Sequence, residues 1–72
     1  MTNDQIADVL DQVADLLEFE SANPFRIRAY RSGSRVVREL AESVSAIVED
    51  ATRELTELPG IGKDLAEKIR RF

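Results

Sequence analysis

Apolar residues recur at intervals of three and four along the first part of the chain, from Ile6 to Leu17. This spacing predicts an amphipathic helix, and Thr2 with Gln5 three positions later matches the capping box that begins one. We therefore expect a first helix that starts after Thr2 and runs through Phe19. Its opposite side carries aspartates, which we interpret as a solvated face: Asp4, Asp8, Asp11 and Asp15.

A second helix is predicted from Pro24 to about Leu40. Residues 21–24 interrupt the apolar pattern, and Asn23 followed by Pro24 is a favourable N-cap and first helical residue. Gly33 lies inside this helix, where glycine costs about 1 kcal/mol relative to alanine, so we expect a close backbone approach there. The apolar side of the helix consists of Phe25, Ile27, Ala29, Tyr30, Val36, Val37 and Leu40.

Shorter helices are predicted for the rest of the chain. Ser43 is suited to cap one of them, a further short helix should end near Glu57, and the last should run from Lys63 to Phe72. Leu55 and Leu58 are expected to face inward. The segment after Ser43 carries Val44, Ile47 and Val48, and the last helix carries Leu65, Ala66, Ile69 and Phe72 at helical spacing, with Phe72 expected to be exposed. The pattern as a whole predicts an all-α fold, a compact bundle of four to five short helices.

Composition narrows the chemistry available to this fold. The chain has 72 residues, which is the size of a single domain, residues 1–72, and it contains no cysteine and no histidine. Disulfides, thiolate and histidine metal sites, cysteine nucleophiles and imidazole bases are therefore excluded. The N-terminus has neither the basic nor the apolar region of a secretory signal, so we expect an intracellular protein without a membrane partner.

The net charge of −4 conceals a segregation of charge along the chain. Residues 1–23 carry six acids and no base, and residues 24–38 carry five arginines and no acid. A second basic segment follows at residues 58–72. Four arginines step by three and four along one side of the second helix and form a continuous stripe: Arg28, Arg31, Arg35 and Arg38. If the two basic segments converge, they form a local anion-binding face on an acidic protein.

The residues between the last two predicted helices form a glycine turn. Pro59 ends the preceding helix, while Gly60 and Gly62 permit positive φ angles and leave no side chain to block a ligand. Ile61 can anchor the turn in the core. The free N–H groups that begin the next helix, at Lys63, then favour a phosphate. Because the turn follows a helix and not a strand, dinucleotide-binding and P-loop motifs are excluded, and a purely structural connector is the alternative.

Two stretches resemble known sequences. Leu58-Pro-Gly-Ile-Gly-Lys-Asp-Leu-Ala-Glu-Lys-Ile69 resembles the helix-hairpin-helix motif of DNA repair proteins, which places that motif at about residues 50–72. Asn23-Pro-Phe-Arg-Ile-Arg-Ala-Tyr-Arg31 resembles the N-terminal 8-kDa domain of family X DNA polymerases, especially the bacterial and archaeal members. The resemblance covers nearly the whole chain. It implies a domain that holds the 5′ phosphate side of gapped or nicked DNA without reading sequence, as a fragment of a longer repair polymerase.

The resemblance also implies roles for single residues. Lys68 matches a lysine that forms a Schiff base with a 5′ deoxyribose phosphate in some members, and Tyr30 matches a tyrosine of that lyase pocket. The backbone carbonyls of Thr56, Leu58 and Ile61 match a site for a monovalent cation, Na⁺ or K⁺, and no other cofactor is expected. Asp64 and Ser32 depart from the family, since animal members carry a phosphate-binding lysine at the position of Asp64 and a lysine is usual at that of Ser32. The stripe and the turn supply the expected phosphate contacts: Arg26, Arg28, Arg31, Arg35, Gly60, Ile61, Gly62, Lys63 and Lys68.

Lyase chemistry at Lys68 depends on its neighbours. A lysine attacks an aldehydic sugar only as the neutral amine, a form that nearby cations such as Arg26 or Arg71 favour. Glu67 or Asp64 facing the amine would oppose it.

Three functions stay open from the sequence: a DNA phosphate-binding module, a 5′-deoxyribose phosphate lyase, and a helical protein-interaction module without DNA binding. No paired carboxylates with a basic phosphate clamp occur, so nucleotidyl transfer is not assigned to these residues and would belong to a polymerase body elsewhere in the parent chain. We expect a monomer in the prokaryotic cytoplasm, associated with the nucleoid.

Overall fold

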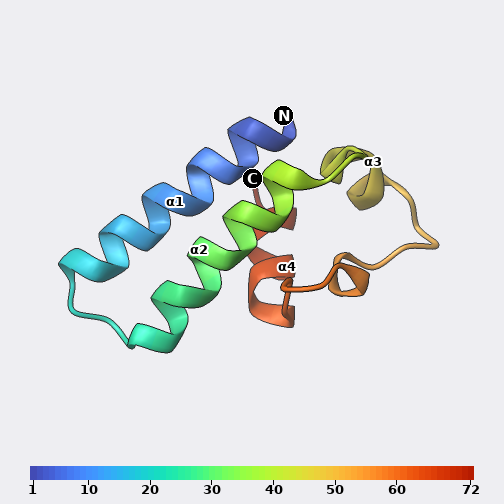
Figure 1. The fold of residues 1–72 in the computed structure, drawn as a ribbon. Helices are drawn as coiled ribbons and strands as arrows, with labels where there is room; N and C mark the ends of the chain where they lie inside the picture. The colour runs from blue at the N-terminus through green and yellow to red at the C-terminus, as the bar shows by residue number, and fades with distance from the viewer.

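The computed structural model describes residues 1–72 and confirms an all-α fold (Figure 1). The first two helices form an antiparallel hairpin, and the remaining elements pack against one side of it. The elements are α1 (Asn3–Phe19), α2 (Pro24–Glu39), α3 (Val44–Glu49), a single 3₁₀ turn η1 (Leu55–Glu57) and α4 (Lys63–Arg70). No helix combines the length and the apolar character that crossing a membrane would require.

The ends of α1 and α2 follow the predicted caps. The Thr2 hydroxyl accepts a hydrogen bond from the Gln5 N–H at 3.2 Å, and the Gln5 side chain accepts one from the Thr2 N–H at 2.9 Å. The Asn23 side chain accepts from the Phe25 N–H at 2.9 Å, with Pro24 as the first residue of α2. These local signals place both helix starts where the sequence predicts them.

The α2 helix packs against α4 at Gly33, where the expected close approach is confirmed. A Cβ at this position would collide with Cδ2 of Leu65 and lie 3.4 Å from its Cγ. The hydroxyl of Ser34, which is also buried, donates to the carbonyl oxygen of Ala7 at 3.1 Å and so links α2 to α1. Small residues on α2 thus let two other helices approach its backbone.

The segment after α3 differs from the prediction of a short helix ending near Glu57. Only the 3₁₀ turn Leu55–Glu57 is helical. The Asp50 carboxylate accepts hydrogen bonds from the N–H of Thr52 at 2.9 Å and from its hydroxyl at 2.6 Å. Such local side-chain bonds compete with helix formation, which explains why residues 50–54 turn instead of continuing a helix. Leu55 and Leu58 are nevertheless buried, as predicted.

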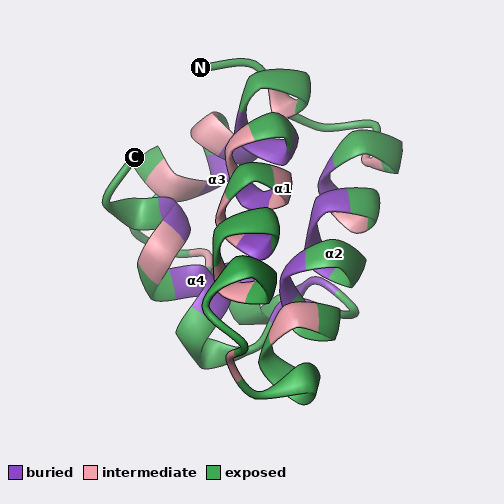
Figure 2. Cartoon of the chain, turned by 90° about the vertical axis from the view of Figure 1, so that its left-hand side faces the viewer, coloured by how far each residue is buried: buried purple, intermediate pink, exposed green.

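The core lies between the α1–α2 hairpin and the C-terminal half of the chain (Figure 2). Its largest fully buried side chains are Tyr30, Leu10, Ile47, Leu55, Val37 and Val44. Phe25, which the sequence pattern assigned to the apolar side of the second helix, is instead 75% exposed, and Phe72 is exposed as expected, at 41%. Phe25 is the second residue of α2, where fewer neighbouring side chains are available to cover it. The side chain of Asn3 links the start of α1 to the start of α3. Its Nδ2 donates a hydrogen bond to the Glu42 carbonyl oxygen, and its Oδ1 accepts one from the Val44 N–H, both at 2.8 Å.

Candidate nucleic-acid interface

The glycine turn before α4 is fixed to the core by its apolar residues. Ile61 is buried, and its N–H donates to the Leu58 carbonyl oxygen at 3.1 Å, which closes the turn. Gly60 has a φ of +87°, a conformation that residues with side chains rarely adopt, and a Cβ there would lie 3.0 Å from Cγ2 of Val36 on α2. The turn is therefore held in one shape by Ile61 on one side and by α2 on the other.

Gly62 is the N-cap of α4, and it leaves the start of this helix bare. Its φ of −83° lies in the ordinary region, so Gly62 does not use the positive φ that glycine permits. The physical reason is that a residue before a helix takes the extended conformation that starts the helix. No side chain caps α4, and a Cβ at Gly62 would meet nothing within 4 Å. The space beside Gly62 is thus open to a ligand.

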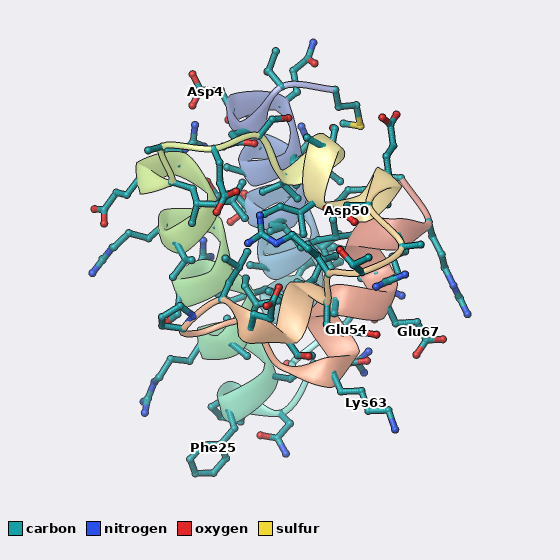
Figure 3. All side chains as sticks on the ribbon, turned by 90° about the vertical axis from the view of Figure 1, so that its right-hand side faces the viewer. Asp4, Phe25, Asp50, Glu54, Lys63 and Glu67 are labelled. Atoms are coloured by element: carbon teal, nitrogen blue, oxygen red, sulfur yellow. The ribbon has the colours of Figure 1, made fainter.

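The first turn of α4 offers backbone donors to this open space. The first hydrogen bond of the helix runs from the Ala66 N–H to the Gly62 carbonyl oxygen at 2.9 Å. The N–H groups of Lys63, Asp64 and Leu65 precede it and have no partner within the helix. They add to the positive end of the helix dipole, which favours an anion. Lys63 is exposed and projects at the end of the molecule opposite Asp4 (Figure 3).

Arg26 is the predicted phosphate ligand that the fold brings to this turn. It lies in the first turn of α2, and its Nε is 3.7 Å from Oδ2 of Asp64 in the first turn of α4. Both side chains are about half exposed or more, at 49% and 66%. The two basic segments of the sequence therefore converge here, and they do so through Arg26.

Arg31 and Arg38 lie elsewhere, because they face α1. The Arg31 guanidinium contacts Asp15 at 2.9 Å and Glu18 at 2.7 Å. The Arg38 guanidinium contacts three other carboxylates of α1 at distances of 2.6 to 3.9 Å: Asp8, Asp11 and Asp4. The aspartates of α1 are thus not only a solvated face, as expected, but ion-pair partners of α2. The hydrogen bonds that both guanidinium groups donate to these carboxylates raise the pKa of each arginine above its usual value.

Arg28 and Arg35 are exposed and have no ion-pair partner, although Arg35 lines an open surface pocket with Arg31, Arg38, Ser34 and Asp11 of α1. Arg35 lies two residues after Gly33, about 160° around the helix from the side that contacts α4. Arg28 is seven residues before Arg35 and shares its side. Arg28, Arg31, Arg35 and Arg38 thus lie within about 80° of one another on α2, as the predicted stripe requires, because residues three and four apart share one helix face. What differs among them is pairing, since acids of α1 engage Arg31 and Arg38 but not Arg28 or Arg35.

Six of the ten basic residues form ion pairs with carboxylates, and the other four have no ion-pair partner. The unpaired ones are Arg28, Arg35, Lys63 and Lys68. Lys68 is only partly exposed, and it follows Asp64 by one helical turn on the same side of α4. Its acidic neighbour in the sequence, Glu67, is paired with Arg71 at 3.0 Å and points away from the bundle (Figure 3).

Tyr30 lies one helical turn after Arg26 on the same side of α2. It is fully buried, and its Oη has no hydrogen-bond partner in the protein. Burying an unpaired hydroxyl costs about 1–3 kcal/mol. Neither surface pocket is lined by Tyr30, so the structure does not bring this hydroxyl to a surface where a substrate would bind.

The carbonyl groups assigned to a monovalent cation lie in one short stretch. Thr56 is inside the 3₁₀ turn, Leu58 ends it, and Ile61 is in the glycine turn. The Leu58 oxygen accepts one hydrogen bond, from Ile61, and a carbonyl oxygen has a second lone pair for a cation. Sequence and fold are thus compatible with this site.

The sequence pattern assigned Phe25 to the apolar side of the second helix, but the side chain is exposed in the structure. It precedes Arg26, and the Arg28 guanidinium carbon lies 6.0 Å from the centre of its ring. Phe25 and Lys63 project at the same end of the molecule (Figure 3). The signal available in the sequence was the position of Phe25 in the first turn after Pro24, among arginines.

Comparison with known families agrees with this geometry. A family model described as a helix-hairpin-helix domain matches residues 1–72, the whole chain. No curated protein matches the sequence.

Proposed function

We propose that this chain, which belongs to the helix-hairpin-helix domain family, binds DNA through a phosphate group seated on the glycine turn. Helix-hairpin-helix domains bind DNA, and the family supports non-specific binding. The observation that carries the proposal for these residues is the bare start of α4, where Gly62 provides no side-chain cap and leaves open space. Backbone N–H groups recognise phosphate oxygens in any sequence, so such a site does not read bases.

The proposed ligand is the 5′ phosphate at a gap in DNA. A terminal phosphate carries a charge of about −1.5 to −2 at neutral pH, more than the single charge of an internal phosphodiester. Lys63 beside the turn and Arg26 across from it supply two cations for that extra charge. The resemblance to the N-terminal domain of family X polymerases supports the same ligand, and we infer that the domain serves a repair polymerase of that kind.

Phe25 extends the proposed contact beyond the phosphate. A gap leaves template bases unpaired, and an exposed aromatic ring can stack on an unpaired base whatever its identity. Phe25 is exposed next to Arg26, and Arg28 lies over its ring. We propose that this ring covers a base at the gap while the turn holds the phosphate.

The test is a binding titration with three oligonucleotide duplexes: one gapped with a 5′ phosphate, one gapped with a 5′ hydroxyl, and one intact. The phosphorylated gap should bind most tightly. Three or four phosphate contacts predict that log K falls against log salt with a slope near −3, at about 0.9 per contact. Equal affinity for all three duplexes would refute the 5′ phosphate. No binding to any of them would remove the DNA function and favour a protein-interaction module.

A second candidate function is 5′-deoxyribose phosphate lyase through Lys68. The observation in its favour is that both acids near Lys68 are directed to arginines, Asp64 to Arg26 and Glu67 to Arg71. In this reaction the Lys68 amine would attack the sugar aldehyde and water would leave, forming an imine. Loss of a proton from the sugar C2′ then breaks the C3′–O bond and expels the phosphate on the 3′ side. Tyr30, which the resemblance assigns to the lyase pocket, is fully buried, so its hydroxyl would have to become accessible before it could position a base or water in that step.

Borohydride reduction tests the lyase directly. A covalent adduct on a 5′ deoxyribose phosphate substrate that is lost in Lys68→Ala would support it. Trapping that persists in Lys68→Ala would assign the chemistry to another amine, and no trapping in the wild-type protein would leave binding as the function.

A further inference from the structure

We infer that Asp64 is a built-in competitor for the phosphate and limits the affinity of the site. This inference rests on the proposed function, because it concerns the same turn. The inference gives Asp64 a role, although binding a phosphate does not require a carboxylate. The Arg26–Asp64 ion pair must open for a phosphate to gain the full attraction of Arg26.

The geometry of the pair indicates that it opens easily. The separation of 3.7 Å between Arg26 Nε and Asp64 Oδ2 is longer than a hydrogen bond, and the pair has one carboxylate only. Arg31, by contrast, contacts two carboxylates at 2.9 and 2.7 Å. Exposed ion pairs of this kind contribute little, so a phosphate can replace Asp64 as the partner of Arg26.

The position of Asp64 makes it a competitor. It is in the first turn of α4, where a negative side chain is favoured by the same partial positive charge that would attract a phosphate. A dianionic 5′ phosphate seated at Gly62 would come close to this carboxylate and be repelled by it. In the absence of DNA, Asp64 thus stabilises the start of α4. Part of this stabilisation is lost when a phosphate binds there.

Asp64→Asn tests this role, and Glu67→Gln is its matched control. Both variants remove one negative charge from α4, but Glu67 is three residues further along and is paired with Arg71. Asp64→Asn should raise affinity for the phosphorylated gap about fivefold, the upper range for one exposed charge pair, and Glu67→Gln by less than about twofold. The gain from Asp64→Asn should be smaller on the gap with a 5′ hydroxyl, because the extra charge is then missing. Thermal melts confirm that each variant is folded.

The outcomes separate this inference from the proposed function. If the wild-type protein prefers the phosphorylated gap but Asp64→Asn gains no more than Glu67→Gln, the competitor role is wrong and the site remains. An equal gain on both gapped duplexes would likewise overturn it, since the effect would then be one of net charge. If the wild-type protein shows no preference for the 5′ phosphate, the site itself is wrong.

Discussion

Gly33 of α2 and Leu65 of α4 are packed so closely that no side chain fits between them: a Cβ on residue 33 would overlap Cδ2 of Leu65. This contact holds α4, and with it the glycine turn, against the helical hairpin. We predict that Gly33→Ala lowers the free energy of unfolding by about 1–3 kcal/mol, the usual cost of overpacking a core. Urea denaturation measures the change.

A second substitution tests the cause of that loss. In the Leu65→Ala background the overlap is removed, so Gly33→Ala should then cost clearly less than it does alone. Equal costs in both backgrounds would show that the two residues are not in contact in solution.

The two glycines of the turn should respond differently to alanine. Gly60→Ala places a side chain at a φ of +87° and 3.0 Å from Val36, so we expect a loss of about 1–2 kcal/mol in stability. Gly62→Ala meets no neighbour in the protein, so the folded state should be little affected. The added methyl group should nevertheless reduce DNA affinity, because it occupies the approach to the α4 N–H groups. A Gly62→Ala variant that binds like the wild-type protein would contradict the phosphate site.

The basic residues should fall into two classes in salt titrations. Arg26→Gln and Lys63→Gln remove contacts at the turn, so each should weaken DNA binding and reduce the salt slope by about 0.9. Arg31→Gln removes a cation that is already engaged by Asp15 and Glu18, and its slope should stay near that of the wild-type protein. The opposite ranking would place DNA on the α1–α2 face.

Tyr30→Phe should not destabilise the fold. The hydroxyl group has no partner in the protein, so its removal deletes a buried polar atom without breaking a hydrogen bond. We expect an unchanged or slightly higher melting temperature, together with reduced imine trapping if the lyase function holds. A marked fall in melting temperature would show that the hydroxyl does have a partner in the folded protein.

Acid should destabilise the segment around α3. A hydrogen bond from Arg53 lowers the pKa of Glu42 below its ordinary 4.5, and Thr52 lowers the pKa of Asp50 below 3.8. Because both values are lower in the folded state, the unfolded chain binds more protons as the pH falls. The stabilisation is therefore complete above about pH 4.5 and is lost as the pH falls through the folded-state values. Glu42→Gln should reduce the pH dependence of the melting temperature in this range, whereas Glu39→Gln serves as a control outside the pair.

The sequence alone determined the features that depend on neighbours along the chain. Caps at Thr2, Asn23 and Ser43, the period of apolar residues and the glycine turn all act over a few residues, so their outcome could be predicted without the fold. The segment after Asp50 was the exception, because a side chain captured backbone groups that a helix would have used.

The tertiary structure decided which charges are available. The sequence does not distinguish the arginines of α2 from one another. The packing of α2 between α1 and α4 places Arg31 and Arg38 against the acids of α1, and Arg26 against Asp64. Electrostatic interactions depend on distance in space, so the availability of each arginine depends on which carboxylates the neighbouring helices bring to it. Only the fold could therefore separate the stripe into two arginines engaged by α1, Arg31 and Arg38, and two without an ion-pair partner, Arg28 and Arg35.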